Sequence, residues 1–221
     1  MDAVTELDGK LLLWIQETFT ADWLTPIMKF FTGFGEYGVF AIVLCLVLLA
    51  YKKTRRLGII CSIALAFTFL CCNGILKPLV DRPRPWEIFS KVVHHLAHPG
   101  DASFPSGHSA NTMGAAWAMF LATAPVKSLS GAARTYDGTK PLGWRGINAE
   151  PKPLHRISVS AATLALIVGF SRLYLGMHFP SDVIVGLLLG MLCATTVYLA
   201  VGKYEEKHGI IGNEKEDKQE K

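Results

Sequence analysis

Two histidines and one aspartate have the residue types and the spacing that phosphoryl transfer requires. Asp182 follows His178 by four residues in the segment His-Phe-Pro-Ser-Asp. This spacing lets Asp182 accept a hydrogen bond from one ring nitrogen of His178, which leaves the other nitrogen free to attack phosphorus. His108 ends the segment Pro-Ser-Gly-His and is a candidate general acid for the leaving oxygen, and later a base for water. The pattern predicts a covalent phosphohistidine at His178.

Three basic residues accompany these groups and are suited to binding the phosphoryl oxygens. Arg84 and Arg172 offer planar guanidinium groups that match two oxygens, and Lys77 adds a compact point charge. Pro105, just before Ser106-Gly107, favours a helix start, where free amide groups and the helix dipole attract anions. Gly107 permits close approach of the backbone. Together, these groups predict an oxyanion site.

The elements that must position these residues are membrane-spanning helices. Of the 221 residues, 51% are hydrophobic, and the mean hydropathy is +0.32. The hydrophobic residues form long runs with charges between them, as a bilayer requires. Five runs are predicted spans: Tyr37–Ala50, Leu57–Leu76, Gly107–Ala124, Ile157–Leu175 and Ser181–Val201.

Two weaker segments precede these runs. Leu11–Phe19 has the helical spacing of an interfacial amphipathic helix, and Trp23–Phe34, with Lys29 inside it, is either a short span or a second surface helix. The expected fold is therefore an all-α integral membrane bundle of five or six transmembrane helices. Acidic residues come first in the chain, so no removable signal peptide is expected. The net charge of +4 lies in loops and predicts no nucleic-acid partner.

Charge in the loops predicts the orientation in the membrane. Basic residues crowd the connection after the first span (Lys52, Lys53, Arg55, Arg56) and the Pro125–Arg156 connection, so both are expected in the cytoplasm. The Leu79–Phe104 loop and the Met177–Pro180 turn then face outward, as do the three clusters of candidate site residues. A charged cytoplasmic tail is expected over 205–221, after a single membrane domain over 1–204.

The candidate residues resemble the signature of the type 2 phosphatidic acid phosphatase (PAP2) superfamily. Its three parts are Lys-x6-Arg-Pro, Pro-Ser-Gly-His and Ser-Arg-x5-His-x3-Asp, and each has a match here: Lys77 to Arg84-Pro85, Pro105 to His108, and Ser171-Arg172 to His178 and Asp182. The resemblance implies a PAP2/haloperoxidase-like helical bundle with no metal or cofactor. It implies His178 as nucleophile, Asp182 as its partner and His108 as general acid. Lys77, Arg84, Ser106, Gly107 and Arg172 would bind phosphate.

Within this superfamily, the small size and the outward-facing site resemble bacterial enzymes that recycle undecaprenyl diphosphate at the cell membrane. That lipid is the expected substrate, with phosphatidylglycerophosphate and phosphatidate as alternatives. Transfer of phosphate from one lipid to another is a further possibility. A non-enzymatic lipid-binding or transport protein is the alternative from a different class.

Other motifs are expected to be structural. The five cysteines (Cys45, Cys61, Cys71, Cys72, Cys193) lie in apolar runs and are expected to be small buried residues. His94, His95 and His98 are expected in a solvated loop rather than a metal site. Gly186-x3-Gly190 is expected to pack against a neighbouring helix of the same chain. Trp86 is expected at the outer interface.

Overall fold

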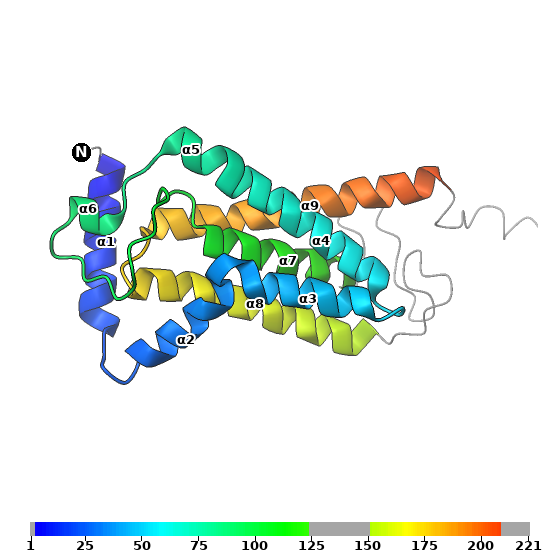
Figure 1. The fold of residues 1–221 in the computed structure, drawn as a ribbon, viewed down its shortest axis with the longest axis horizontal. Helices are drawn as coiled ribbons and strands as arrows, with labels where there is room; N and C mark the ends of the chain where they lie inside the picture. The colour runs from blue at the N-terminus through cyan, green and yellow to red at the C-terminus, as the bar shows by residue number, and fades with distance from the viewer. Residues whose placement is uncertain (1–2, 124–150, 209–221) are drawn as a thin grey trace, which may run out of the picture.

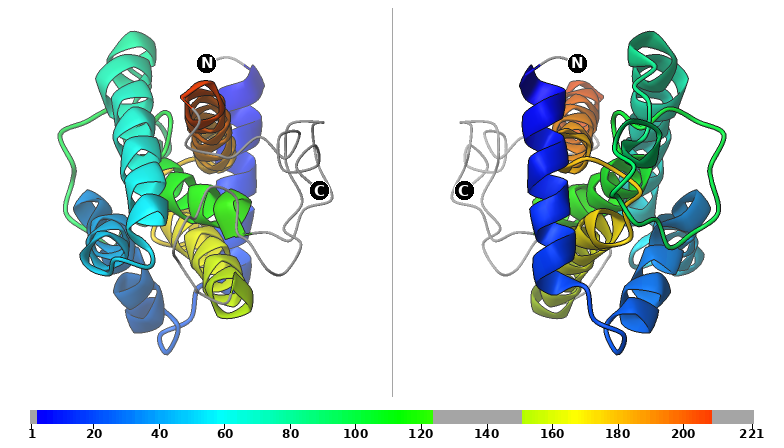
Figure 2. Two further views of the ribbon diagram at one scale, coloured as in Figure 1. Left: turned by 90° about the vertical axis from the view of Figure 1, so that its right-hand side faces the viewer. Right: turned by 90° about the vertical axis from the view of Figure 1, so that its left-hand side faces the viewer.

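A computed structural model describes residues 3–123 and 151–208, and every regular element in these two stretches is helical. Long helices run side by side along the molecule, whereas α1 (Ala3–Phe19) lies across one end of the bundle (Figure 1). Figure 2 shows the same crossing from the end of the bundle. The expected all-α membrane bundle is confirmed. The amphipathic segment expected over Leu11–Phe19 is helical, but its helix begins eight residues earlier.

The two segments after α1 form a bent pair. α2 (Thr25–Gly35) and α3 (Val39–Ala50) are joined by the 3₁₀ turn η1 (Glu36–Gly38), and their axes differ by 51°. Gly38 ends that turn with a φ of 70°, in the left-handed region that glycine enters without steric cost. Together, the segment Trp23–Phe34 and the first predicted span form a bent pair with the geometry of a broken span or a re-entrant loop.

The next helix carries the first cluster of site residues at its end. α4 (Arg55–Phe69) continues through a π-helical stretch, η2 (Leu70–Leu76), into the short α5 (Lys77–Val80). Lys77 therefore lies at the point where this long helical run ends. After a turn, α6 (Pro85–Ile88) begins with Arg84 at its N-cap, where Glu87 accepts a hydrogen bond from the Arg84 amide at 2.9 Å.

α7 (Gly107–Thr123) is the central helix of the bundle. It packs between α8 (Pro151–Tyr174) and α9 (Pro180–Lys207), and most of its residues are buried. Small residues make this close packing possible: a side chain at Gly186 would place its Cβ 2.7 Å from the Ser106 carbonyl oxygen. At Gly190 it would lie 2.8 Å from the Gly114 nitrogen. The two glycines thus pack inside the chain, as expected.

Three of the described helices are long and apolar enough to cross a membrane, and the bent α2–α3 pair makes a fourth if it forms one span. The expected number of five or six transmembrane helices stays a prediction. Of the predicted spans, only Ala124 falls outside the described residues, as does most of the Pro125–Arg156 connection.

Two predicted boundaries were wrong. The expected loop over 125–156 ends earlier, because α8 begins at Pro151. The tail expected to begin at Glu205 begins later, because α9 continues to Lys207. Glu205 is buried and binds Arg56, whose Nε lies 2.6 Å from its carboxylate. The ion pair with Arg56 of α4 therefore keeps the last turn of α9 against the bundle, although its charged composition suggests a tail.

Four of the five cysteines are buried and Cys71 is partly buried, and none forms a disulfide. The expectation of small buried residues is confirmed. Cys45 and Cys61 belong to the apolar core between α3, α4, α7 and α9, which includes Leu57, Ala64 and Met119. This core occupies the half of the bundle away from α1. The end of α8 and the starts of α7 and α9 lie toward the α1 end, with α5 above them (Figure 1).

Candidate active site

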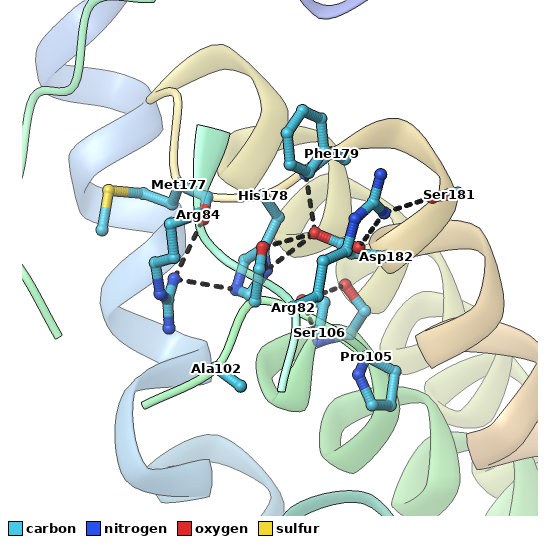
Figure 3. Close-up of polar contacts among 12 residues, drawn as sticks. Arg82, Arg84, Ala102, Pro105, Ser106, Met177, His178, Phe179, Ser181 and Asp182 are labelled. Atoms are coloured by element: carbon cyan, nitrogen blue, oxygen red, sulfur yellow. Dashed lines mark hydrogen bonds and ion pairs between the residues drawn. The ribbon is translucent and has the colours of Figure 1, made fainter. Parts of the chain in front are cut away.

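His178 lies in the turn between α8 and α9, with its two ring nitrogens in different surroundings (Figure 3). Its Nδ1 faces Asp182 in the first turn of α9, and Nδ1 and the nearer carboxylate oxygen are 3.6 Å apart. Ser103 lies beside both groups: its hydroxyl donates to Asp182 at 2.5 Å and is 3.4 Å from Nδ1. The predicted pairing is therefore present, but at 3.6 Å it is a polar contact supplemented by Ser103 rather than a direct hydrogen bond.

The other nitrogen, Nε2, faces cationic groups. It lies 3.5 Å from a terminal nitrogen of Arg84, which donates to the Met177 carbonyl at 2.9 Å. His178 is only 1% exposed. Burial, aided by the positive charges of Arg84 and Arg172 and opposed by Asp182, lowers the pKa of His178 to about 4. The imidazole is therefore neutral near pH 7, with a lone pair available at a ring nitrogen.

A cavity of about 710 Å³ opens in front of His178 and is lined by all three predicted cations, Lys77, Arg84 and Arg172. Each cation is at most 5% exposed. They come from three elements: the start of α5, the N-cap of α6 and the last turn of α8. Arg172 is anchored through one terminal nitrogen to the Thr32 hydroxyl at 2.7 Å, and its buried Nε makes no hydrogen bond within the described residues. Glu36 and Asp101 also line the cavity, but the three cations outnumber these carboxylates and suit the binding of an oxyanion.

Asp101 already occupies part of this cationic surface. Its carboxylate forms ion pairs with Lys77 and, at 2.6 Å, with Arg84. Burial alone would raise its pKa, but the hydrogen bond and charge of Lys77, together with Arg84, lower the pKa to about 2. The backbone also contributes, since Lys77 donates to the Ala102 carbonyl at 2.9 Å. In this structure a carboxylate thus lies where two of the phosphate-binding candidates meet.

His108 lies on the wall of the same cavity, in the first turn of α7. Its Nε2 is buried and makes no hydrogen bond in the described part of the chain. Gly35 at the end of α2 packs against the ring: a Cβ there would lie 2.7 Å from the imidazole Cδ2. The helix start that carries His108 also brings Gly107 to the cavity wall. A second imidazole and the positive end of a helix therefore line the space in front of His178.

Ser106 does not line this cavity. It is fully buried, its amide donates to the Asp182 carbonyl at 3.0 Å, and its hydroxyl accepts from the Ser109 hydroxyl at 3.0 Å. Ser106 therefore joins the start of α7 to the start of α9. Its expected role as a phosphate ligand lacks geometric support in this structure.

Four polar residues that sequence reasoning did not select complete the site. Ser103 and Asp101 precede the Pro-Ser-Gly-His segment, and Arg82 lies inside the Lys-x6-Arg spacing, so proximity to a motif was the available signal. Arg82 donates to Asp182 at 2.6 Å and to Asp8 of α1 at 2.9 Å. Nothing local to α1 marks Asp8, because its partners are more than 70 residues away.

A second, apolar groove of about 410 Å³ adjoins the cationic cavity. Three residues line both spaces: Gly38, Phe69 and Asn111. The remaining lining residues lie on α3 and α4, among them Ile42 and Leu65. The side-chain oxygen of Asn111 is buried without a hydrogen-bond partner in the described residues. A polar head and an apolar chain of one ligand fit this pair of spaces.

The histidine cluster after α6 has another arrangement. His94 and His98 are exposed, as expected for a solvated loop, and their Nε2 atoms lie 2.7 Å apart. Trp86 stacks on His98 and lies beside Arg84, with the guanidinium carbon 5.5 Å from the indole centroid. No set of three or more His, Cys, Asp or Glu residues in 3–123 and 151–208 is placed to hold a metal.

Comparisons with known proteins identify relatives of this chain. The model of the PAP2 superfamily matches residues 56–206. Phosphatidylglycerophosphatase B of Bacillus subtilis is 29% identical over 84% of this chain and 77% of its own. Undecaprenyl-diphosphatase of Sulfolobus acidocaldarius is 29% identical over 76% of this chain and 66% of its own.

Two solved structures share the fold. The transmembrane PAP2-type phosphatidylglycerolphosphate phosphatase of Bacillus subtilis has a TM-score of 0.63 and 26% identity, covering 94% of this chain and 88% of its own. LpxE of Aquifex aeolicus has a TM-score of 0.58 and 22% identity, covering 85% and 92%.

Proposed function

Because the chain belongs to the PAP2 superfamily of membrane lipid phosphatases, we propose that it hydrolyses undecaprenyl diphosphate to undecaprenyl phosphate and inorganic phosphate, with His178 as the nucleophile. One observation carries the assignment of the nucleophile. The Nε2 of His178 lies 3.5 Å from Arg84, beside a cavity that Lys77 and Arg172 also line, while Nδ1 faces Asp182 and Ser103. Asp182 orients the imidazole and offsets part of the positive charge that develops on it as it attacks.

The reaction follows from the positions of these groups. The Nε2 lone pair of His178 attacks the terminal phosphorus, and the bond from phosphorus to the bridging oxygen breaks. That oxygen leaves with the bonding electrons and takes a proton from His108. Water, losing its proton to His108, then attacks the phosphohistidine and releases inorganic phosphate. Lys77, Arg84 and Arg172 offset the charge on the equatorial oxygens throughout.

The apolar groove supports a lipid as the substrate. It meets the cationic cavity at Asn111 and opens among the apolar residues of α3 and α4. An isoprenoid or acyl chain in this groove would place its phosphate beside His108 and His178.

The choice of undecaprenyl diphosphate rests on two arguments. Relatives with that activity in their names include those from Sulfolobus acidocaldarius and Bacillus subtilis, the latter 25% identical over 76% of this chain. A site on the outer face of the plasma membrane, as the loop charges predict, suits a carrier lipid released there. Phosphatidylglycerophosphate is the second candidate, because a relative and a solved structure of similar fold carry that name.

The test is phosphate release in detergent with EDTA, from a panel of undecaprenyl diphosphate, phosphatidylglycerophosphate and phosphatidate. Wild type is compared with His178→Ala, and with His94→Ala as a control that removes an exposed histidine. We expect metal-independent release that is fastest with undecaprenyl diphosphate and absent in His178→Ala. Equal turnover of all three lipids would refute the narrow substrate. Full activity of His178→Ala would refute the nucleophile.

Two further measurements address the remaining alternatives. Product analysis with and without acceptor lipids distinguishes hydrolysis from phosphate transfer between lipids. Labelling of single cysteines placed between Lys127 and Arg156 in intact cells tests the orientation, since reaction with an impermeant reagent from outside would reverse it. A purified protein that binds these lipids without releasing phosphate would be a binding protein instead.

A further inference from the structure

The N-terminal helix α1 carries a buried carboxylate that reaches the reaction centre. Asp8 is 8% exposed, although α1 lies across the end of the bundle and presents exposed apolar residues on its other face (Val4, Leu7, Leu11, Trp14). Three donors bind the Asp8 carboxylate. Arg82 donates at 2.9 Å, the Ser181 amide donates at 3.1 Å, and the Ser181 hydroxyl donates as well. All three belong to segments at the catalytic end.

Arg82 connects Asp8 to the proposed partner of the nucleophile. One terminal nitrogen of its guanidinium donates to Asp8, and the other donates to Asp182 at 2.6 Å and to the Ser181 hydroxyl at 2.8 Å. The guanidinium also lies over the Phe179 ring, 4.1 Å from its centroid. Because the group is planar and held at both ends, it fixes the position of one Asp182 oxygen.

The other Asp182 oxygen is held by different donors. Ser103 donates to it at 2.5 Å and the Phe179 amide at 2.9 Å (Figure 3). This second oxygen is the one that faces Nδ1 of His178. The carboxylate thus has one oxygen bound by Arg82 and one directed to the nucleophile, and rotation about its χ angles would break both sets of contacts.

Asp8 also changes the net charge beside His178. Asp8, Arg82 and Asp182 carry −1, +1 and −1, so the group has a net charge of −1 beside His178. Without Asp8, Arg82 would pair with Asp182 alone and the group would be neutral. In a buried site this change in net charge is weakly screened. The loss of Asp8 would therefore destabilise the positive charge that develops on the imidazole as His178 attacks phosphorus.

We propose that Asp8 of α1 is a positioning residue for the reaction: through Arg82 it sets the position and the net charge of the Asp182 carboxylate behind His178. The inference rests on the proposed phosphatase reaction, in which His178 is the nucleophile. It makes α1 part of the catalytic apparatus. It also places a membrane-facing helix in direct contact with the residues behind the nucleophile.

The test compares full-length Asp8→Asn, Asp8→Glu and Glu6→Gln with wild type in detergent. Glu6 is the matched control, because it is an exposed carboxylate on the same helix that pairs with Lys10. Turnover is measured on undecaprenyl diphosphate and on p-nitrophenyl phosphate, together with the inhibition constant of inorganic phosphate. Thermal unfolding of each variant is recorded.

We expect Asp8→Asn to lower kcat about 10- to 100-fold, the usual range for an outer partner of a catalytic group. KM and the phosphate inhibition constant should change less than about twofold, because Asp8 contacts none of the phosphate-binding cations. The acid limb of the pH profile should move to lower pH. Without the charge of Asp8, protonated His178 is less stabilised, and its pKa falls. Glu6→Gln should match wild type, and Asp8→Glu should recover part of kcat.

Unchanged kcat in Asp8→Asn would overturn the inference. So would a parallel loss of kcat, phosphate binding and thermal stability, because Asp8 would then support only the fold. If Asp8→Asn does not fold, Arg82→Lys, which keeps the charge but cannot bridge both carboxylates, must show the same selective loss of kcat. A wild type inactive on both substrates would refute the proposed function itself, whereas an active wild type with a normal Asp8→Asn refutes only this inference.

Discussion

Asp101 lies on two of the cations that the substrate phosphate is proposed to use, and replacing it with asparagine should tighten phosphate binding. The carboxylate pairs with Lys77 and Arg84, so an incoming phosphate must displace it. Because its pKa is about 2, it stays ionised, and thus competes, at every pH near neutrality. Asparagine keeps the shape of the side chain and removes the charge.

The size of the effect follows from the exposure of the ion pairs. The Asp101 side chain is 52% exposed, so solvent screens both contacts. An exposed pair contributes about 0.2–1 kcal/mol, and two pairs contribute about 0.4–2 kcal/mol. Removing this competition should tighten phosphate binding by about 2- to 30-fold. High salt should shrink the difference, because both pairs are partly in water.

The assay is competitive inhibition by inorganic phosphate, with p-nitrophenyl phosphate as substrate and Asp101→Asn compared with wild type. Asp81→Asn is the charge-matched control, because Asp81 is an exposed carboxylate in the same connection between α5 and α7 and does not line the cavity. We expect a lower inhibition constant only in Asp101→Asn. Weaker phosphate binding in that variant would refute the reasoning, because Asp101 would then be holding the cations in place for the substrate.

Three further results are expected. The acid limb of kcat/KM, corrected for ionisation of the substrate, should lie near pH 4, because the lowered pKa of His178 keeps the imidazole neutral above that pH. An acid limb at pH 6.5 would contradict the buried environment of His178. Ser103→Ala should lower kcat at least about tenfold with little change in KM, since a hydrogen bond to a charged group such as Asp182 contributes about 1.5–3 kcal/mol. An unchanged kcat would exclude Ser103 from the support of Asp182. Asn111 lies where the two cavities meet, so we expect its amide to contact the leaving group of a lipid substrate. Asn111→Leu, which keeps the volume and removes the amide, should lower the turnover of lipid diphosphate relative to p-nitrophenyl phosphate about tenfold. Equal effects on both substrates would show that Asn111 does not contact the leaving group.

The helices and the family could be predicted from the sequence because their signals are local. A run of about 20 apolar residues has few stable alternatives to a helix in a bilayer, so each predicted span has a matching helix. The motif residues around His108, His178 and Arg84 could likewise be selected from residue type and spacing. The structure brings them to one cavity, while their roles in the reaction stay predictions.

Contacts between distant segments could not be predicted in this way. Ser106 follows the motif, yet its side chain turns toward Ser109 and its amide toward α9, because α7 and α9 pack too closely to leave it in the cavity. Glu205 belongs by composition to a charged tail, but Arg56 of another helix binds it. In both cases a partner far along the chain decides the outcome.

The sequence by itself determined the chemistry on offer and the helices that carry it, because residue type, short spacing and hydrophobic length are properties of neighbouring residues. Only the tertiary structure decided which charges meet. Asp101 pairs with two of the cations proposed to bind phosphate. Asp8 contacts Arg82, 74 residues away in the sequence, and Arg82 contacts Asp182, a further 100 residues away. Such pairings depend on how the helix ends converge in space. A buried charge without a partner is costly, so each charge that the fold buries requires one.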